Sequence, residues 1–169
     1  MPKTDNLTAE EAVAHKFYSA FQNMEAETMA SCYDSEAHFT DPVFPQLRGN
    51  EIGDMWRMLV SQAKNFSLEF KNIRTENGIV RVDWEAKYTF SQTNRLVHNI
   101  IQAEMTIKDG KIFLHRDRFD LWRWFRQAMG LKGLFVGWLP FAQKALRETA
   151  ARNLRLFRIE MKKNSKKKG

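Results

Sequence analysis

The stretch from His115 to Arg118 carries ionisable side chains whose types and spacing suit proton transfer. In an extended strand, residues two apart point to one face, so His115 and Asp117 share a face that Arg116 does not. A histidine beside an aspartate can act as a base with its orienting partner, and partial burial shifts the pKa values of such groups. We therefore predict His115 and Asp117 to be catalytic residues on a pocket wall. The alternative is a structural ion pair, with Asp117 held by an arginine such as Arg81.

Asp41 is the third candidate for proton transfer and lies in the segment Phe39-Thr40-Asp41-Pro42-Val43. A carboxylate beside an apolar pocket can take a proton from a carbon next to a carbonyl group. Aspartate also accepts backbone hydrogen bonds in turns, so the alternative is that Asp41 caps a turn at Pro42.

Five further side chains are predicted to line the pocket and contact its ligand: Tyr18, Trp56, Trp84, Tyr88 and Asn99. Asn99 is the one polar residue on the apolar face of its strand. A buried amide needs hydrogen-bond partners, which a ligand or a water molecule can supply. For the four aromatic residues, packing in the hydrophobic core is the alternative.

Neither a metal site nor a cofactor is predicted. The four histidines show no metal-ligand spacing, and Cys32 is the only cysteine. The sequence contains no glycine-rich phosphate loop and no Gly-x-Ser-x-Gly elbow.

Three helices followed by a run of strands should position the candidate side chains. Thr8 and Glu11 form a capping-box pattern, and Asn77-Gly78 and Asp109-Gly110 are two-residue hairpin turns. Helices are expected over residues 8–24, 26–33 and 51–65, a short extended segment over 37–40, and strands over 67–74, 80–90, 97–107 and 111–119. On the last strand, alternation gives one face with Phe113, His115, Asp117 and Phe119 and the other with Ile112, Leu114, Arg116 and Arg118. Such a sheet has one apolar face that the helices must cover, which predicts an α+β fold.

Three segments resemble the SnoaL-like branch of the NTF2-like superfamily: HKFYSAFQNMEAETMASCY, AHFTDPVFPQLRG and DGKIFLHRDRFD. The resemblance covers roughly residues 10–130. It implies a cone-shaped α+β fold, with a curved antiparallel sheet wrapped around three N-terminal helices and a pocket at the wide end. The branch includes polyketide cyclases, ketosteroid isomerases and limonene-epoxide hydrolases, so the fold alone does not give the function.

The segment around Asp41 is similar to the one that holds the catalytic base of ketosteroid isomerases. That enzyme also needs an oxyanion hole made of a tyrosine and a protonated aspartate. Aligned without gaps, this chain has Phe17 in place of the tyrosine and Ala103 near the other donor. Without these donors the largest catalytic contribution is missing, so steroid isomerase activity is not expected.

Arg81-x-Asp83 together with Asp117 is similar to the pattern of the epoxide hydrolases, which hold a water molecule between two carboxylates. The tyrosine and asparagine that help to position that water would fall at Phe39 and Asp41, and neither is retained. Alternation also assigns Arg81 and Asp83 to the solvated face of their strand.

Positive charge is concentrated in the C-terminal part of the chain. Residues 142–169 contain ten Lys/Arg and two Asp/Glu, whereas the net charge of the whole chain is +7, so the other 141 residues sum to −1. We predict a pocket domain at residues 1–130, an amphipathic basic helical extension at 131–163 and a disordered basic tail at 164–169. The single cysteine and the lack of a visible signal peptide favour the cytoplasm.

The C-terminal extension allows two interpretations. An expected helix over residues 142–163 has Leu146, Ala150, Leu154, Phe157 and Met161 on one side and basic residues on another. Its apolar stripe packs on the body or on a second subunit in the first interpretation. In the second, the basic helix rests on an anionic membrane surface with Trp138 and Phe141 as anchors. Nucleic acid is not expected as a partner, because the basic residues lack interleaved stacking aromatics.

The function predicted from these patterns is the binding of a small hydrophobic, carbonyl-containing molecule by a cytoplasmic homodimer. Isomerisation or aldol-type cyclisation by proton transfer, through Asp41, His115 and Asp117, is predicted if that molecule is a substrate. The alternatives left open are a non-catalytic ligand-binding protein, a protein acting at the inner face of a membrane through its basic helix, and an epoxide hydrolase.

Overall fold

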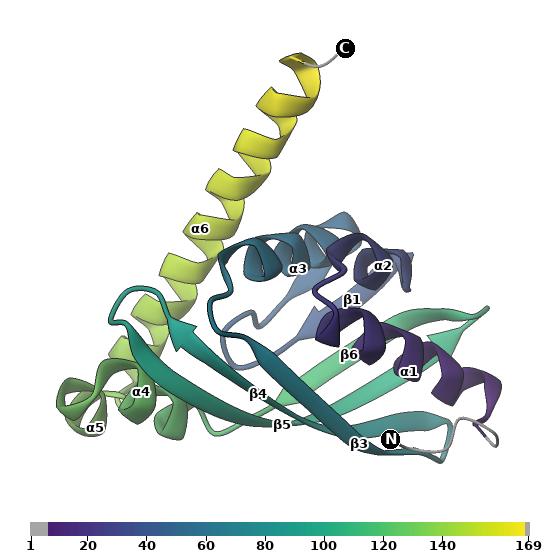
Figure 1. The fold of residues 1–169 in the computed structure, drawn as a ribbon, viewed down its shortest axis with the longest axis horizontal. Coiled ribbons are helices and arrows are strands. Elements are labelled where there is room, and N and C mark those ends of the chain that lie inside the picture. Colours follow the sequence, from purple (N-terminus) through teal and green to yellow (C-terminus); the bar gives the residue numbers. More distant parts are fainter. Residues whose placement is uncertain (1–6, 168–169) are drawn as a thin grey trace.

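One mixed six-stranded sheet is the framework of the computed structural model, which describes residues 7–167 (Figure 1). The strands are β1 (Tyr33–Thr40), β2 (Leu47–Arg48), β3 (Ser67–Glu76), β4 (Ile79–Phe90), β5 (Arg95–Lys108) and β6 (Lys111–Arg118). They lie in the order β2-β1-β6-β5-β4-β3. The α+β class is confirmed. The sheet is not wholly antiparallel, because β1 is longer than expected and pairs with β6 in parallel.

Three helices cover one face of the sheet (Figure 1): α1 (Ala9–Gln22), α2 (Ala26–Ser31) and α3 (Asn50–Gln62). The capping box expected at the start of α1 is confirmed. The Thr8 hydroxyl accepts from the Glu11 amide at 3.2 Å, and the Glu11 carboxylate accepts from the Thr8 amide at 3.1 Å. This reciprocal pair satisfies two amides that have no partner within the helix.

Both predicted hairpin turns are present in the sheet. Asn77 and Gly78 connect β3 to β4 with φ angles of 51° and 75°, and Asp109 and Gly110 connect β5 to β6 with 50° and 73°. Positive φ at both central residues matches the right-handed twist of the flanking strands. The turns therefore help to fix the register of two antiparallel pairs, β3 with β4 and β5 with β6.

Strict alternation on β6 fails at Phe113. The pairing of β6 with β5 shifts between Ile112 and Leu114, so Phe113 is the extra residue of a β-bulge. Ile112 is fully buried on the helix-covered face, and Phe113 is only half-buried, which makes the faces predicted for these two residues wrong. Beyond the bulge, His115 and Asp117 share the buried inner face as predicted.

Three further helices follow the sheet: α4 (Leu121–Met129), α5 (Leu131–Val136) and α6 (Pro140–Lys167). Asp120 caps α4 by accepting from the Arg123 amide at 2.9 Å. Positions 164–167, expected to be disordered, are helical because α6 runs on to Lys167; positions 168 and 169 lie outside the described residues. Figure 1 shows that the C-terminal end of α6 projects away from the body.

As far as Arg158, α6 is held on the body by apolar and ionic contacts. Leu154 is buried, and Phe157 packs against the same core. On α3, the Arg158 guanidinium bonds to Asp54 at 2.8 Å and to Glu51 at 2.9 Å. The apolar stripe of this helix therefore faces the body. None of the helices within residues 7–167 combines the length and apolarity needed to cross a bilayer.

Candidate functional site

A cavity of about 280 Å³ lies between the inner face of the sheet and helices α3, α4 and α6. Its wall is mainly apolar and aromatic, with Phe21, Phe66 and Ile101 among the contributors. α6 supplies Leu146, Thr149, Ala150 and Asn153, so the C-terminal extension is part of the wall. Concave apolar sites with a few polar groups are typical of small-molecule binding.

Six of the eight predicted site residues line this cavity: Asp41, Trp56, Trp84, Tyr88, Asn99 and Asp117. His115 lies behind Asp117 and has 2% of its surface exposed. Tyr18 was expected to line the cavity, but it lies in the core with no exposed surface. Its position one residue after Phe17 on α1 turns it toward Phe70 and Trp84, whose ring centroids are 5.6 and 5.8 Å away.

A chain of hydrogen bonds runs through the protein interior and ends at Asp117. The Trp56 indole donates to the Tyr33 hydroxyl at 3.1 Å, and that hydroxyl bonds to Nδ1 of His115 at 2.6 Å. Nε2 of His115 bonds to Oδ1 of Asp117 at 3.1 Å, and the Trp84 indole donates to the same oxygen at 3.4 Å. The two ends, Trp56 and Asp117 with Trp84, reach the cavity wall.

The donors in this chain favour one arrangement of protons. An indole N–H can only donate, and the Tyr33 oxygen already accepts from Trp56. Burial raises the pKa of Tyr33 well above its usual range, so its hydroxyl keeps its proton and donates it to Nδ1 of His115. The other ring nitrogen, Nε2, then carries the hydrogen that points at Asp117. Each group in the chain then has a hydrogen-bond partner, with Nδ1 of His115 accepting and Nε2 donating.

Aromatic rings fix the position of His115. Phe39 and Phe17 meet its ring edge-on at centroid distances of 5.1 and 5.6 Å, and Tyr33 stacks on it at 6.0 Å. This packing excludes water from the imidazole and limits its rotation. His115 is therefore suited to orient Asp117 rather than to contact a ligand.

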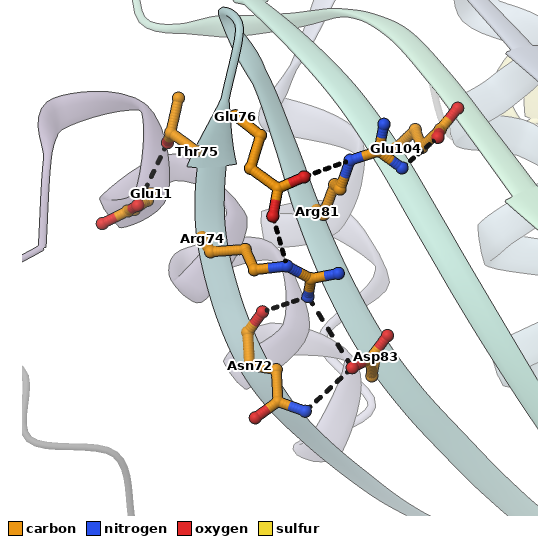
Figure 2. A network of polar contacts seen from close by, with 8 residues as sticks. All are labelled: Glu11, Asn72, Arg74, Thr75, Glu76, Arg81, Asp83 and Glu104. Atoms are coloured by element: carbon orange, nitrogen blue, oxygen red, sulfur yellow. Dashed lines mark hydrogen bonds and ion pairs between the residues drawn. The ribbon is translucent and has the colours of Figure 1, made fainter.

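Arg81 does not hold Asp117, so the arginine named in the ion-pair alternative is wrong. Figure 2 shows Arg81 in a network on the outer face of the sheet, where it pairs with Glu76 at 3.1 Å and Glu104 at 2.5 Å. Asp83 belongs to the same network and accepts from Asn72 at 2.8 Å. Because Arg81 and Asp83 face away from Asp117, the epoxide hydrolase pattern is not assembled at these residues.

Asp41 lies in the cavity wall just after the end of β1. Its Oδ1 accepts from the amides of Val43 at 2.7 Å and Phe44 at 2.5 Å, so it also forms the predicted turn at Pro42. Burial raises the pKa of Asp41 to about 7; the Phe44 amide opposes this shift, and the charge of Asp117 adds to it. Near neutral pH the carboxyl is thus protonated in a large share of molecules.

Tyr88 is a second hydrogen-bond donor in the wall. Its oxygen accepts from the Trp124 indole at 2.8 Å, which leaves the hydroxyl hydrogen available to another acceptor. Burial is the main cause that raises the pKa of Tyr88, and the charge of Asp41 contributes. The Tyr88 hydroxyl therefore stays protonated beside Asp41.

Tyr18 carries a buried hydroxyl with no hydrogen-bond partner within residues 7–167. Burial, followed by the charge of Asp117, raises the pKa of Tyr18 well above its usual range. The group therefore remains neutral. Among the described residues, His, Cys, Asp and Glu side chains form no group of three or more that could hold a metal ion.

Three contributors to the site were not predicted from the sequence. Tyr33 bonds to His115 only because β1 and β6 are neighbours, although the two residues are 82 positions apart. Trp124 orients Tyr88 across 36 positions. The part of the cavity wall that α6 supplies depends on how the C-terminal extension folds back onto the body. No local pattern signals such contacts, although the apolar stripe of α6 indicated that its side must be covered.

The model of a SnoaL-like domain matches residues 14–115 of the sequence. The chain belongs to this SnoaL-like family. The matched region covers α1 to the middle of β6 and stops before Asp117, α4, α5 and α6. Among curated proteins, none matches the sequence.

Solved structures show that the SnoaL-like chain has the NTF2-like fold. An NTF2-like protein of unknown function from Burkholderia pseudomallei has a TM-score of 0.64 at 13% identity, covering 72% of this chain and 98% of that one. A LEH-like epoxide hydrolase from M. tuberculosis has a TM-score of 0.62 at 20% identity, with 76% and 96% covered. TerC, co-crystallised with polyporic acid, has a TM-score of 0.57 at 15% identity, with 67% and 92% covered. At these identities the likeness concerns the fold alone.

Proposed function

We propose that the protein binds a small hydrophobic molecule with a carbonyl group and catalyses proton transfer on it, as an isomerisation or an aldol-type cyclisation. The observation that carries this proposal is that Asp41 and Asp117 lie in the wall of one apolar cavity with different hydrogen-bond partners, and that burial raises the pKa of Asp41. Two titratable groups whose environments favour different protonation states are a basis for acid and base roles. The binding of polyporic acid by TerC, which has the same fold, is compatible with a carbonyl-containing ligand.

Asp117 is the base in this mechanism. Its Oδ1 accepts from His115 and Trp84, so the carboxylate is oriented and its negative charge is stabilised. It takes a proton from the carbon next to the substrate carbonyl, and the electron pair moves to the carbonyl oxygen. His115 is a positioning residue, because it touches Asp117 and is buried behind the wall.

Tyr88 and the protonated Asp41 donate hydrogen bonds to the oxygen that becomes negative. Together they take the role of the donors that Phe17 and Ala103 cannot provide, and donors aimed at developing charge are a large catalytic contribution. In an isomerisation the proton returns to another carbon; in a cyclisation the carbanion attacks a second carbonyl. Asn99 offers a further polar contact in the same wall.

The experiment follows exchange of the acidic protons of 2-tetralone in D₂O by NMR, with and without the protein. We expect the wild-type protein to accelerate exchange, and Asp117→Asn to remove the acceleration while the melting temperature stays within a few degrees. Asp83→Asn, on the outer face of the sheet, is the matched control and should exchange like wild type.

Two results would reject the catalytic proposal. If wild type binds 2-tetralone in ligand-observed NMR but does not accelerate exchange, the cavity is a binding site only. If Asp117→Asn unfolds the protein, the buried chain of hydrogen bonds is structural.

We also propose that the protein acts as a homodimer in the cytoplasm. Apolar side chains on the outer face of β5 and β6 support the dimer: Leu96, Ile100 and Leu114 are 75%, 48% and 44% exposed. The single, buried Cys32 suits a reducing compartment. Light scattering after size-exclusion chromatography tests the dimer, and a monomer at micromolar concentration would contradict it.

A further inference from the structure

Helix α5 packs against α4 through glycines. A Cβ atom at Gly133 would lie 1.9 Å from the backbone oxygen of Phe125, and one at Gly137 would lie 2.4 Å from the Phe125 Cβ. Both glycines are buried, so at these two positions the segment contacts α4 without a side chain. The large residues of the segment are consequently turned away from the body.

These outward residues form an apolar tip: Leu131, Leu134, Phe135, Trp138 and Phe141. Leu131 is 76% exposed, Phe135 69%, Trp138 61% and Phe141 66%. An ordinary amphipathic helix buries such residues and exposes small or polar ones, so the orientation here is the reverse. In Figure 1 α5 and the start of α6 lie at one end of the molecule. Several large apolar side chains exposed together indicate an interaction surface.

The sequence of the apolar tip and its flanks carries mainly positive charge. From Leu121 to Arg147 the sequence contains five basic residues and no aspartate or glutamate. Lys132 is exposed within the tip, and the Arg126 guanidinium stacks on the exposed Trp122 ring at 4.3 Å. An isologous contact with a second copy of the chain would bring these cations together, which is unfavourable.

We propose that the apolar tip docks on the surface of an anionic phospholipid bilayer. Leucine, phenylalanine and tryptophan side chains enter the boundary between headgroups and acyl chains, where tryptophan is favoured. The surrounding lysine and arginine side chains contact anionic headgroups. This interaction does not depend on the proposed catalytic activity.

The basic end of α6 does not form part of this surface. α6 has 28 residues, which corresponds to about 42 Å at 1.5 Å per residue. Figure 1 shows the helix rising from α5 and ending clear of the body, so its last turns, Lys162 to Lys167, lie far from the tip. Its apolar stripe, which a helix resting on lipid would need, faces the body.

The test is co-sedimentation of the full chain with vesicles of phosphatidylcholine plus phosphatidylserine, and of phosphatidylcholine alone. Wild type should bind the mixed vesicles and bind the neutral ones weakly. The double variant Phe135→Ser/Trp138→Ser should bind the mixed vesicles at least about tenfold more weakly, because it loses two apolar anchors. Lys132→Glu should weaken binding to mixed vesicles and leave the weak neutral binding unchanged.

The matched control is Leu156→Ser/Ile159→Ser, which removes two exposed apolar side chains from α6, away from the apolar tip. It should bind vesicles like wild type. The proposal is overturned if binding survives in Phe135→Ser/Trp138→Ser and is lost in Lys162→Ser/Lys163→Ser, because the helix end would then be the lipid contact. It is also overturned if wild type binds no vesicles and the tip variant turns a dimer into a monomer in light scattering.

Discussion

Asp41 and Asp117 are neighbours across the one parallel pair of the sheet. Thr40 is the register partner of Arg116, so each aspartate is the next residue along its strand direction. Both line the same cavity, and the charge of Asp117 is one cause of the raised pKa of Asp41. The parallel pairing of β1 with β6 therefore brings together two carboxyl groups that are far apart in the sequence.

The two carboxyl groups differ in their hydrogen-bond partners. Asp117 accepts from the side chains of His115 and Trp84, and Asp41 accepts from the backbone amides of its own turn. The amides oppose the rise in the pKa of Asp41 but do not overcome its burial. Like charges in one cavity repel, so the charge of Asp117 disfavours the ionised form of Asp41.

The first prediction concerns stability as a function of pH. The pKa of Asp41 is about 7 in the folded protein against 3.8 for an unperturbed aspartate. Between these values the native state holds a proton that the unfolded chain has released. Stability from this group is fully present below about pH 4 and is lost as the pH rises to about 7. The loss is up to about 4 kcal/mol.

Urea unfolding of wild type and Asp41→Asn at about pH 5 and about pH 8 measures this effect. The free energy of unfolding of Asp41→Asn should change less between the two pH values. Equal changes in both proteins would show that Asp41 titrates normally.

The second prediction concerns Tyr33. Tyr33→Phe leaves Nδ1 of His115 and the Trp56 indole without their partner, at a cost of about 1–3 kcal/mol of stability. Because His115 then orients Asp117 less well, exchange of 2-tetralone protons should slow by about tenfold. Tyr18→Phe is the control, since its buried hydroxyl has no partner and its removal should be neutral or stabilising. Equal destabilisation by both changes would reject the role of Tyr33.

The third prediction concerns Tyr88, the proposed donor to the substrate oxygen. Tyr88→Phe should reduce kcat for exchange by about a hundredfold, with little change in KM, because the donor acts mainly on the developing negative charge. The stability cost should be small, although the Trp124 indole loses its acceptor. A rise in KM with unchanged kcat would instead assign Tyr88 to ligand binding alone.

The fold was predictable where signals were local. Turn residues at Asn77-Gly78 and Asp109-Gly110, together with alternation, predicted four strands and the shared face of His115 and Asp117. The bulge at Phe113 could not be predicted, because a single extra residue leaves no distinct pattern in the sequence. The strand faces predicted from alternation are therefore right for the residues after the bulge and wrong for Ile112 and Phe113.

Non-local contacts limited the prediction of the site. Tyr18 was predicted to line the pocket, whereas Tyr33 was expected at the end of the helix over residues 26–33 and was given no role in the site. The structure reverses their importance, because pairing of β1 with β6 brings the Tyr33 hydroxyl to His115. The apolar stripe of α6 indicated that this side of the helix must be covered. It did not indicate that α6 would form part of the cavity wall.

The fourth prediction concerns the attachment of α6. Arg158 bonds to Asp54 and Glu51 at the partly exposed contact with α3, so Arg158→Ala should cost about 0.5–1 kcal/mol. Because α6 forms one wall of the cavity, its release should also raise the dissociation rate of 2-tetralone and speed proteolysis within the helix. Arg155→Ala, an exposed position on the same helix, is the control. Unchanged dissociation in Arg158→Ala would show that α6 does not retain the ligand.

The last prediction concerns Gly133 and the contact between α5 and α4. Gly133→Ala places a methyl group 1.9 Å from the Phe125 backbone oxygen, which a rigid helix cannot accommodate. We expect α5 to move away from α4, with a loss of about 1–3 kcal/mol and faster amide exchange confined to these helices. Vesicle binding should fall as well, because the apolar tip loses its fixed orientation. Leu134→Ala, on the exposed side of α5, is the control and should leave amide exchange unchanged; normal protection in Gly133→Ala would contradict the glycine contact.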